Sequence, residues 1–441
     1  MRSCWVTFVA LALALAPAAC SDDNGSRPDG STHDGPSQTD GPDPSKTLTW
    51  LAPETLDTNR AGEFAMAVSC GKEIGIAYFR SLKDPVTKTC PATFGGVPTE
   101  KPRPANDVYY VHFDGTAWGT PVKVDQTYGP TEGLSVTADA TCSKIYIGYL
   151  GGELSKQECK SGDAVIASSS DKGQTWTSAT VNAAGPVGDS VGQWMSVALD
   201  AAGAVHSVYR DVHFGYYEYD GNAKSSLWFD AAKASGDVGA GKYASLVFDS
   251  TDRPVAVHYN GTKTTSEGGI QLMYREGTAW QSQQLSASNT EGSRLDLAYS
   301  GSAFGVTFYK SSKQALYYLE SSDLKTWSET QVDTNLTNNG KFAALAFDSR
   351  GNPAISYYLC NDYGSPSCDY GKDGLNFAYR SGTKWKVTEK IDDGGAQKCG
   401  EHTALAFGPG DEPVIAYRCV RFDNLSGEWV DTLKVIRGVY K

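Results

Sequence analysis

Short apolar runs alternate with polar turns over most of this chain, and one run recurs. The recurring motif is a five-residue stretch of alternating apolar and small or polar positions: AMAVS at Ala65, SVTAD at Ser135, SVALD at Ser196, SLVFD at Ser245, DLAYS at Asp296, ALAFD at Ala344 and ALAFG at Ala404. The motif starts lie 48 to 70 residues apart. Periods of roughly 40–50 residues that hold several short strands are typical of β-propellers. The pattern therefore predicts an all-β, seven-bladed propeller.

Each motif begins a pattern of four strands. A second β run follows it and ends in a tyrosine in every unit: Tyr78, Tyr149, Tyr209, Tyr259, Tyr309, Tyr358 and Tyr417. In most units a third run, a glycine-containing or polar turn and a Trp-led run come next, at 108–118, 272–280, 316–327 and 375–385. Two hairpins of this kind make a four-stranded antiparallel sheet, which is one propeller blade.

The last unit has too few strands, and the N-terminal end of the domain matches the missing one. The segment LTWLAPETLD at 48–57 resembles TAWGTPVKVD at 116–125, the fourth strand of the first unit. We expect this N-terminal strand to complete the last blade and close the ring, which removes exposed sheet edges. Three positions align without a gap: Trp50, Pro53 and Asp57 with Trp118, Pro121 and Asp125.

Residues 1–20 have the features of an export signal. Arg2 precedes an apolar run, 6–16, that is too short to span a bilayer as a helix. The segment ends Pro-Ala-Ala-Cys at Cys20, which resembles the lipobox of bacterial lipoproteins, although Pro17 stands where an aliphatic residue is usual. This resemblance implies a lipid on Cys20, a membrane contact through that lipid only, and a place on the cell envelope, in the outer membrane. Ordinary secretion is the alternative.

The next segment, 21–46, contains almost only Ser, Asp, Gly, Pro, Thr and Asn. It buries too little apolar surface to offset the entropy of ordering, so we expect a disordered tether. The propeller domain then covers 47–441. The formal net charge of −12 and the lack of a basic run argue against a nucleic-acid partner. We expect a monomer.

Eight cysteines lie beyond the export signal, and an even number in an exported chain predicts disulfides. None forms a CxxC pair, so we expect no zinc site. No loop has the full ligand spacing of a calcium site, so we expect no other metal, and we expect no cofactor. From their places in the strand pattern we expect four pairs: Cys360 with Cys368, Cys399 with Cys419, Cys90 with Cys159 and Cys70 with Cys142.

One turn matches a known motif. Residues 169–176, SSDKGQTW, fit S-x-D-x-G-x-T-W and resemble the Asp-box, or BNR repeat, of sialidases and other propellers; 321–327 is a shortened copy. The resemblance implies a turn between third and fourth strands, on the face opposite the ligand-binding mouth. It therefore implies a structural role for Ser169, Asp171, Gly173, Thr175 and Trp176.

A ligand would bind at one mouth of the central channel, where second strands end and first strands begin. Four long insertions fall on this face, in neighbouring units, at 81–107, 151–162, 360–373 and 419–430. Cations, carboxylates and aromatics together suit sugars, particularly anionic ones, although polar loop ends explain any one of them alone. The mouth residues we expect are Arg80, Glu132, Trp194, Arg210, Asp211, His258, Arg294, Lys310, His402 and Arg418.

Three functions fit this sequence. The Asp-box resemblance suggests a sialidase-type glycosidase, but the Arg-Ile-Pro motif of that family is absent. A polysaccharide lyase would use His213, Tyr209 and Arg210, with His206 nearby, to move a proton and neutralise a uronate; His206 is more simply a strand residue packed between sheets. We favour the third function, a tethered non-catalytic module that binds a glycan or protein, since nothing in the sequence requires catalysis.

Overall fold

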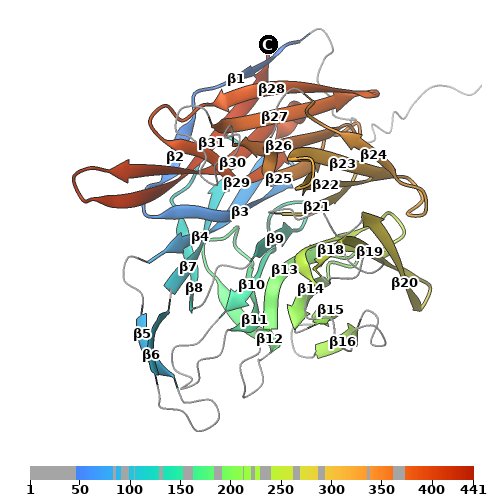
Figure 1. Ribbon diagram of the computed structural model, residues 1–441. Helices are drawn as coiled ribbons and strands as arrows, with labels where there is room; N and C mark the ends of the chain where they lie inside the picture. Colours follow the sequence, from blue (N-terminus) through green and yellow to red (C-terminus); the bar gives the residue numbers. More distant parts are fainter. Residues whose placement is uncertain are drawn as a thin grey trace, which may run out of the picture. The chain divides into compact units, whose positions relative to one another are not determined.

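The propeller predicted from the repeats is present in the computed structural model, whose described residues are all-β apart from one short 3-10 turn, Pro409–Asp411 (Figure 1). It describes residues 46–82, 86–90, 99–103, 105–128, 133–151, 162–182, 191–211, 213–219, 224–228, 240–261, 269–286, 294–334, 338–360 and 373–441. No helix in these ranges is both long and apolar enough to cross a membrane.

Among the described residues, six sheets hold four antiparallel strands each, and we number them blades 1 to 6 in chain order. Blade 1 is β3 (Ala61–Cys70), β4 (Glu73–Ser81), β7 (Ala105–Phe113) and β8 (Val122–Tyr128). Blade 2 is β9 (Leu134–Ala138), β10 (Ile145–Gly151), β11 (Asp163–Ser169) and β12 (Thr177–Asn182). Blade 3 is β13 (Val191–Leu199), β14 (Val205–Asp211), β15 (His213–Tyr219) and β16 (Lys224–Trp228).

The next three blades repeat this order. Blade 4 is β17 (Lys242–Phe248), β18 (Pro254–Asn260), β19 (Gly269–Glu276) and β20 (Ala279–Ser286). Blade 5 is β21 (Asp296–Tyr299), β22 (Phe304–Lys310), β23 (Ala315–Ser321) and β24 (Ser328–Gln331). Blade 6 is β25 (Asn339–Phe347), β26 (Pro353–Leu359), β27 (Gly374–Ser381) and β28 (Lys384–Asp392). A small separate ribbon, β5 (Val86–Cys90) and β6 (Thr99–Arg103), lies in the insertion of blade 1.

The two ends of the domain share one further sheet, which we call the closing sheet. It contains β29 (Lys398–Phe407), β30 (Pro413–Asp423) and β31 (Glu428–Tyr440), and β31 pairs with β1 (Leu48–Trp50) and β2 (Glu54–Asp57). The predicted N-terminal closure is therefore confirmed. The closing strand is interrupted at Pro53, which has no N–H to donate to the ladder.

The first strands contact one another in the order β3, β9, β13, β17, β21, β25 and β29, and β29 contacts β3 again. The first residue of the repeated motif joins several of these strands. Ser135, Ser196 and Ser245 each accept a hydrogen bond at 3.1 Å from a backbone N–H of the next blade. The Asp296 carboxylate does the same at 2.9 Å with Leu345. A polar residue therefore begins these motifs because it bonds blades 2, 3, 4, 5 and 6 in series.

A second device joins the remaining interfaces and also the one between blades 5 and 6. A buried tyrosine on the second strand of one sheet donates its hydroxyl to an aspartate at the outer end of the sheet before it. The pairs are Tyr78 with Asp57 at 2.6 Å, Tyr149 with Asp125, Tyr357 with Asp333 at 2.8 Å and Tyr417 with Asp392 at 2.6 Å. In blade 6 the tyrosine is Tyr357 rather than the Tyr358 of the repeat pattern. Together the two devices bond every neighbouring pair among blades 1 to 6 and the closing sheet.

The Asp-box turn at residues 169–176 joins β11 and β12, where the resemblance placed it. The Asp171 carboxylate accepts the N–H of Thr175 at 2.9 Å and its hydroxyl at 2.6 Å, and these bonds lower the pKa of Asp171 to about 2. The Trp176 indole donates to Gly173 O at 3.0 Å, and its ring lies 5.2 Å from that of Tyr110 in blade 1. The turn is thus closed locally, and its tryptophan packs between two sheets.

Two of the four expected disulfides are present in the described part of the chain. Cys70–Cys142 joins the first hairpin turns of blades 1 and 2, and Cys399–Cys419 joins opposite residues of β29 and β30. Cys360 is also disulfide-bonded. Its expected partner Cys368, together with Cys159 and Cys20, lies outside the described residues, and the side chain of Cys90 does too.

Candidate functional site at the channel mouth

First strands begin and second strands end on one face, which is the mouth. At or near the start of five first strands the sequence reads glycine, any residue, then an aromatic or histidine, and the third residue has a positive φ of 49° to 54°. The left-handed region is unfavourable for such bulky residues, at a cost of about 1–3 kcal/mol each, and strain of this kind clusters at ligand sites. We call the five the aromatic collar: Phe64, Trp194, Tyr243, Phe342 and His402.

The collar depends on a register shift and on its glycines. In the five sheets the pairing of first and second strands slips next to the collar residue, and a bulge of this kind re-aims a side chain. The glycine allows close approach to the preceding blade: a Cβ on Gly192 would lie 2.6 Å from the Cα of Ala164. The sequence carries a signal for the collar, because glycine, any residue and an aromatic or histidine recur just before the repeated motif in five units.

The collar residues fall into two groups around the channel. His402 lies between Phe64, at 4.8 Å, and Phe342, at 4.4 Å between ring centroids. On the other side, Trp194 and Tyr243 are 5.8 Å apart. Gly133 and Arg294 stand at the equivalent position, two residues before the ladder residue, in blades 2 and 5. The two groups of collar residues are therefore separated on one side by Gly133, which has no side chain, and on the other by the cation Arg294.

Arg294 crosses the channel instead of joining the collar. Its Nη1 donates to Thr403 O of the closing sheet at 2.6 Å and to Ala65 O of blade 1 at 3.3 Å. Burial lowers the pKa of His402 well below its usual value, and the nearby Arg418 and Arg294 lower it further. Burial also raises the pKa of Asp296, which Arg294 opposes. His402 is therefore neutral at physiological pH.

Replacing His402 with phenylalanine, the residue of blades 1 and 6, should make folding less sensitive to acid. In the unfolded chain His402 binds a proton near pH 6.5, but in the folded protein its pKa is far lower, so its neutral form contributes stability above pH 6.5 that is lost as pH falls. The loss is about 1.4 kcal/mol per pH unit. Urea unfolding should show the variant gaining about 2 kcal/mol on the wild type between about pH 7.5 and 5. If the difference in unfolding free energy between variant and wild type were the same at both pH values, His402 would not have the lowered pKa.

The rim of the mouth is a network of paired charges. Arg418 bonds Glu401 at 3.0 Å and Asp431 at 2.8 Å, and lies 3.6 Å from Glu63. Arg80 bonds Asp57 at 2.6 Å, and its guanidinium carbon lies 3.7 Å from the ring centre of Tyr109. These two predicted mouth arginines are thus already paired with carboxylates of the protein.

Two other predicted mouth residues point elsewhere. Lys310 pairs with Glu329 on the outer strand of blade 5 at 2.7 Å and lies over Tyr317, so it faces the blade's outer part. His258 is buried, and its Nδ1 accepts the N–H of Gly241 at 3.1 Å, so it supports the backbone below the collar. Glu132 lies outside the described residues, and so does the side chain of Asp211.

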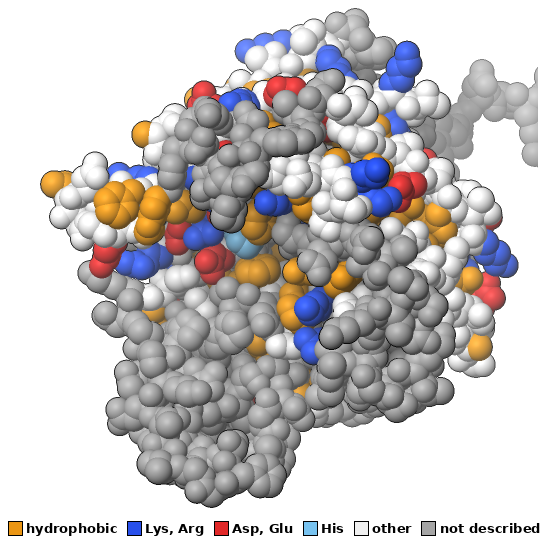
Figure 2. Space-filling model, in the orientation of Figure 1, with side chains coloured by type: hydrophobic (Ala, Val, Ile, Leu, Met, Phe, Trp, Pro, Cys, Tyr) orange, Lys and Arg blue, Asp and Glu red, His pale blue; other side chains and the backbone are white. Residues whose placement is uncertain are grey.

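Trp194 lies beside two cations at the mouth. Its ring is partly exposed, with the Arg210 guanidinium carbon 5.6 Å and the Lys242 Nζ 5.9 Å from the ring centre. Both cations are within the distance at which they interact with an indole face. Tyr243 packs against the ring edge-on. Figure 2 shows this face, with hydrophobic side chains beside lysines, arginines and carboxylates.

Of the residues expected to serve a lyase, the structure describes the side chains of His206, Tyr209 and Arg210, and His206 does not lie beside Arg210. His206 pairs with Ala198 near the β13–β14 turn, at the end of the strand away from Arg210, and bonds Asp200 at 2.9 Å. Its ring packs on Phe248 of blade 4, 4.9 Å away, as expected for a residue between sheets. Tyr209 is fully buried in the core. The side chain of His213 lies outside the described residues.

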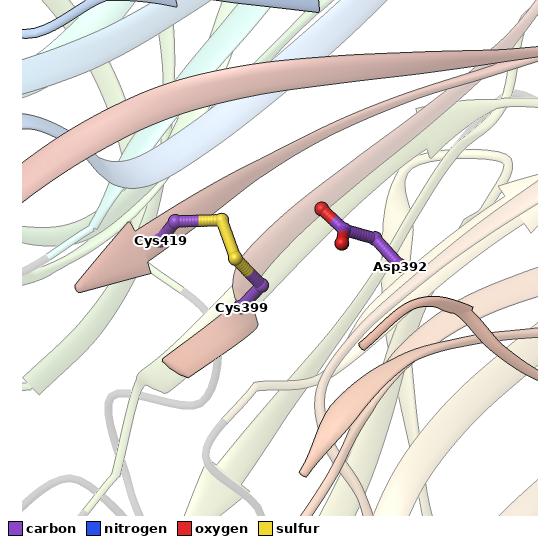
Figure 3. Close-up of side chains that lie close together, drawn as sticks. All are labelled: Asp392, Cys399 and Cys419. Atoms are coloured by element: carbon purple, nitrogen blue, oxygen red, sulfur yellow. A yellow bond between two sulfur atoms is a disulfide. The ribbon is translucent and has the colours of Figure 1, made fainter. Parts of the chain in front are cut away.

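One group of metal-ligand atoms lies close together in the described part of the chain. Asp392, Cys399 and Cys419 offer atoms within 4.8 Å of one another, but both sulfur atoms belong to one disulfide (Figure 3). The Lys434 ammonium lies 3.6 Å from the Asp392 carboxylate. A disulfide lacks the thiolates that bind a metal, so this group is structural.

No protein-family model matches this chain, and no curated protein does either. Solved structures similar to it include the NanB sialidase of Streptococcus pneumoniae, at 11% identity and TM-score 0.44, covering 90% of this chain and 70% of that one. Trypanosoma rangeli sialidase is similar at 10% and 0.46, covering 90% and 60%. The Ruminococcus gnavus intramolecular trans-sialidase is similar at 11% and 0.42, covering 89% and 96%. Likeness this distant carries no argument about ligand or reaction.

Proposed function

We propose that this protein is a non-catalytic binding module whose mouth holds a glycan. In this proposal the closing sheet is the seventh blade, a lipid on Cys20 tethers the chain to the cell envelope, and 21–46 spaces the propeller from the membrane. The protein is a monomer, with no nucleic-acid partner and no cofactor. A protein ligand at the same mouth is the second candidate.

The observation that carries this proposal is the surface at Trp194. A sugar ring presents an apolar C–H face that packs on an indole, and hydroxyl or carboxylate groups that bond cations. Trp194 supplies the face, and Arg210 and Lys242 supply the cations within 6 Å of it. The strained backbone at φ 49° holds the ring in place before a ligand arrives. Two cations beside one indole favour an acidic sugar.

Catalysis is the alternative, as a polysaccharide lyase or a sialidase-like glycosidase. A lyase needs a proton acceptor beside the arginine that neutralises the uronate. His206 is held at the far end of its strand and Tyr209 is buried. Arg80 and Arg418 already have carboxylate partners. The side chains described at the mouth therefore favour ligand binding over catalysis.

The test uses Trp194→Gly, which places in blade 3 the residue that blade 2 has at this position. Glycine accepts the positive φ without strain, so the ring is lost and the backbone is kept. On an array of acidic and neutral glycans, the best ligand of the wild type should bind the variant about tenfold more weakly or worse. Lys242→Ala should also weaken binding. Lys325→Ala, on the opposite face, is the matched control and should not.

Three results would overturn the proposal. The wild type binds no glycan, or Trp194→Gly binds as well as the wild type while melting at the same temperature. The third is catalysis: incubation of the same glycans with the wild type releases unsaturated uronates or new reducing ends. Ultraviolet absorbance and reducing-sugar assays detect those products, which would favour the enzymatic alternative.

A further inference from the structure

The hairpin of β30 and β31 extends beyond the sheet to which it belongs. Pairing of β29 with β30 ends at Lys398 and Val420, and pairing of β2 with β31 ends at Asp57 and Leu433. Past these points β30 and β31 pair only with each other as far as Asp423 and Glu428. This two-stranded ribbon, 421–430, stands out from the propeller on its mouth side (Figure 1).

The ribbon carries the exposed large hydrophobic side chains of the described part of the chain. Phe422 is 46% exposed and Trp429 is 48% exposed, and these two residues are direct cross-strand partners with ring centroids 5.3 Å apart. Leu425, at the tip, is 98% exposed. Figure 2 shows hydrophobic side chains gathered over the hairpin, with charged side chains next to them. Exposed aromatics on a rigid ribbon are typical of contact surfaces.

The aromatic pair faces blade 1. Side chains alternate along a strand, so Phe422 and Trp429 share a face with Leu433 and Val435. Leu433 and Val435 pack against Ala61 and Tyr78 of blade 1. The pair therefore stands over the mouth end of blade 1, as a wall beside the opening.

The floor between this wall and the collar is made of paired charges. Arg60, just before β3, bonds Glu428 of the ribbon at 2.5 Å. Arg418 and Asp431 lie on the aromatic face of the closing sheet and bond each other at 2.8 Å. Arg418 also lies 3.6 Å from Glu63, the neighbour of the collar residue Phe64, so these paired charges extend from the ribbon toward the collar.

We infer that the ribbon is an outer binding position for an extended glycan chain, whose inner end lies at Trp194; this inference rests on the proposed function. One sugar unit packs on Phe422 and Trp429, and hydroxyls along the chain bond the Arg–carboxylate pairs between. A bilayer or an apolar protein pocket fits less well, because either would bury these charged pairs away from water. Three side chains also offer far less area than a stable protein interface requires.

The experiment measures affinity against chain length for the wild-type mature protein, with ladders of oligogalacturonides, hyaluronan and xylan oligosaccharides. Wild-type affinity should rise with length. Trp429→Ala should remove that rise, about tenfold for the longest chains, and leave the shortest unchanged. Trp429 lies outside the hydrophobic clusters, so the melting temperature should not move. Leu425→Ser, on the same ribbon, is the matched control and should bind like the wild type.

Two outcomes overturn the outer position. In one, Trp429→Ala keeps the full length dependence. In the other, Leu425→Ser loses as much affinity as Trp429→Ala, which would indicate apolar docking of the tip on a protein or bilayer. The proposed function fails separately, if Trp194→Gly leaves the shortest oligosaccharides bound as before. The two failures are distinguishable because the shortest oligosaccharides would contact only the mouth, whereas the longest would also contact the ribbon.

Discussion

Replacing Asp57 with alanine should lower the free energy of unfolding by about 3–5 kcal/mol, since it breaks a buried ion pair on the strand that closes the ring. The Asp57 carboxylate accepts the Tyr78 hydroxyl at 2.6 Å, the Arg80 Nη2 at 2.6 Å and the Asn59 N–H at 2.9 Å. Its removal leaves the hydroxyl of a fully buried tyrosine and a largely buried guanidinium without their acceptor. Urea unfolding monitored by tryptophan fluorescence measures the loss.

Glu54→Ala is the matched control for Asp57→Ala. Glu54 lies on the same strand, β2, and its bond to Arg437 at 3.1 Å joins two partly exposed side chains. Exposed pairs contribute little, so this variant should stay within about 0.5 kcal/mol of the wild type. Equal effects of the two substitutions would show that the Asp57 contacts do not hold the N-terminal strand in place. The closure would then depend on β-ladder bonds alone.

The closure was predictable because one alignment contains the bond that makes it. Asp57 aligned with Asp125, and each accepts a tyrosine hydroxyl from the next sheet, Tyr78 or Tyr149. Segments 48–57 and 116–125 resemble each other because each supplies the aspartate that bonds the next sheet. In the same way, Ser196 and Ser245 mark motif starts because each bonds the next first strand. A bond that recurs at successive interfaces requires the same residue type each time, and this makes it visible in the sequence.

The side chains at the mouth were less predictable than the closure, because their directions do not follow the simple alternation of side chains along a strand. The left-handed backbone at Trp194 and His402 shifts the register by a bulge, so position along the strand does not give direction. Lys310 and His258 were expected at the mouth on position alone, and their side chains turn to the outer blade and the interior. Loop geometry beyond the strand ends carries no periodic signal.

Arg294→Met should cost about 3 kcal/mol of unfolding free energy and raise the pKa of His402. Arg294 connects blade 5 to the closing sheet and blade 1 by donating to Thr403 O and Ala65 O, so methionine leaves two carbonyls without that donor. It also removes the charge that opposes the raised pKa of Asp296 and one of the two cations that lower the pKa of His402. Denaturation gives the stability, and histidine NMR titration gives the pKa.

The matched control for Arg294→Met is Arg437→Met, which removes a guanidinium from β31, its partly exposed ion pair with Glu54 and its contact with the Phe113 ring, whose centre lies 5.3 Å away. It should change stability by less than about 1 kcal/mol and leave His402 as it was. If Arg294→Met unfolds no more easily than this control, the channel does not depend on a side chain that crosses it. If stability falls but the His402 pKa stays unchanged, the arginine acts through its hydrogen bonds and not through its charge. A loss of stability together with a higher His402 pKa identifies one guanidinium that both joins three sheets and keeps the collar histidine neutral.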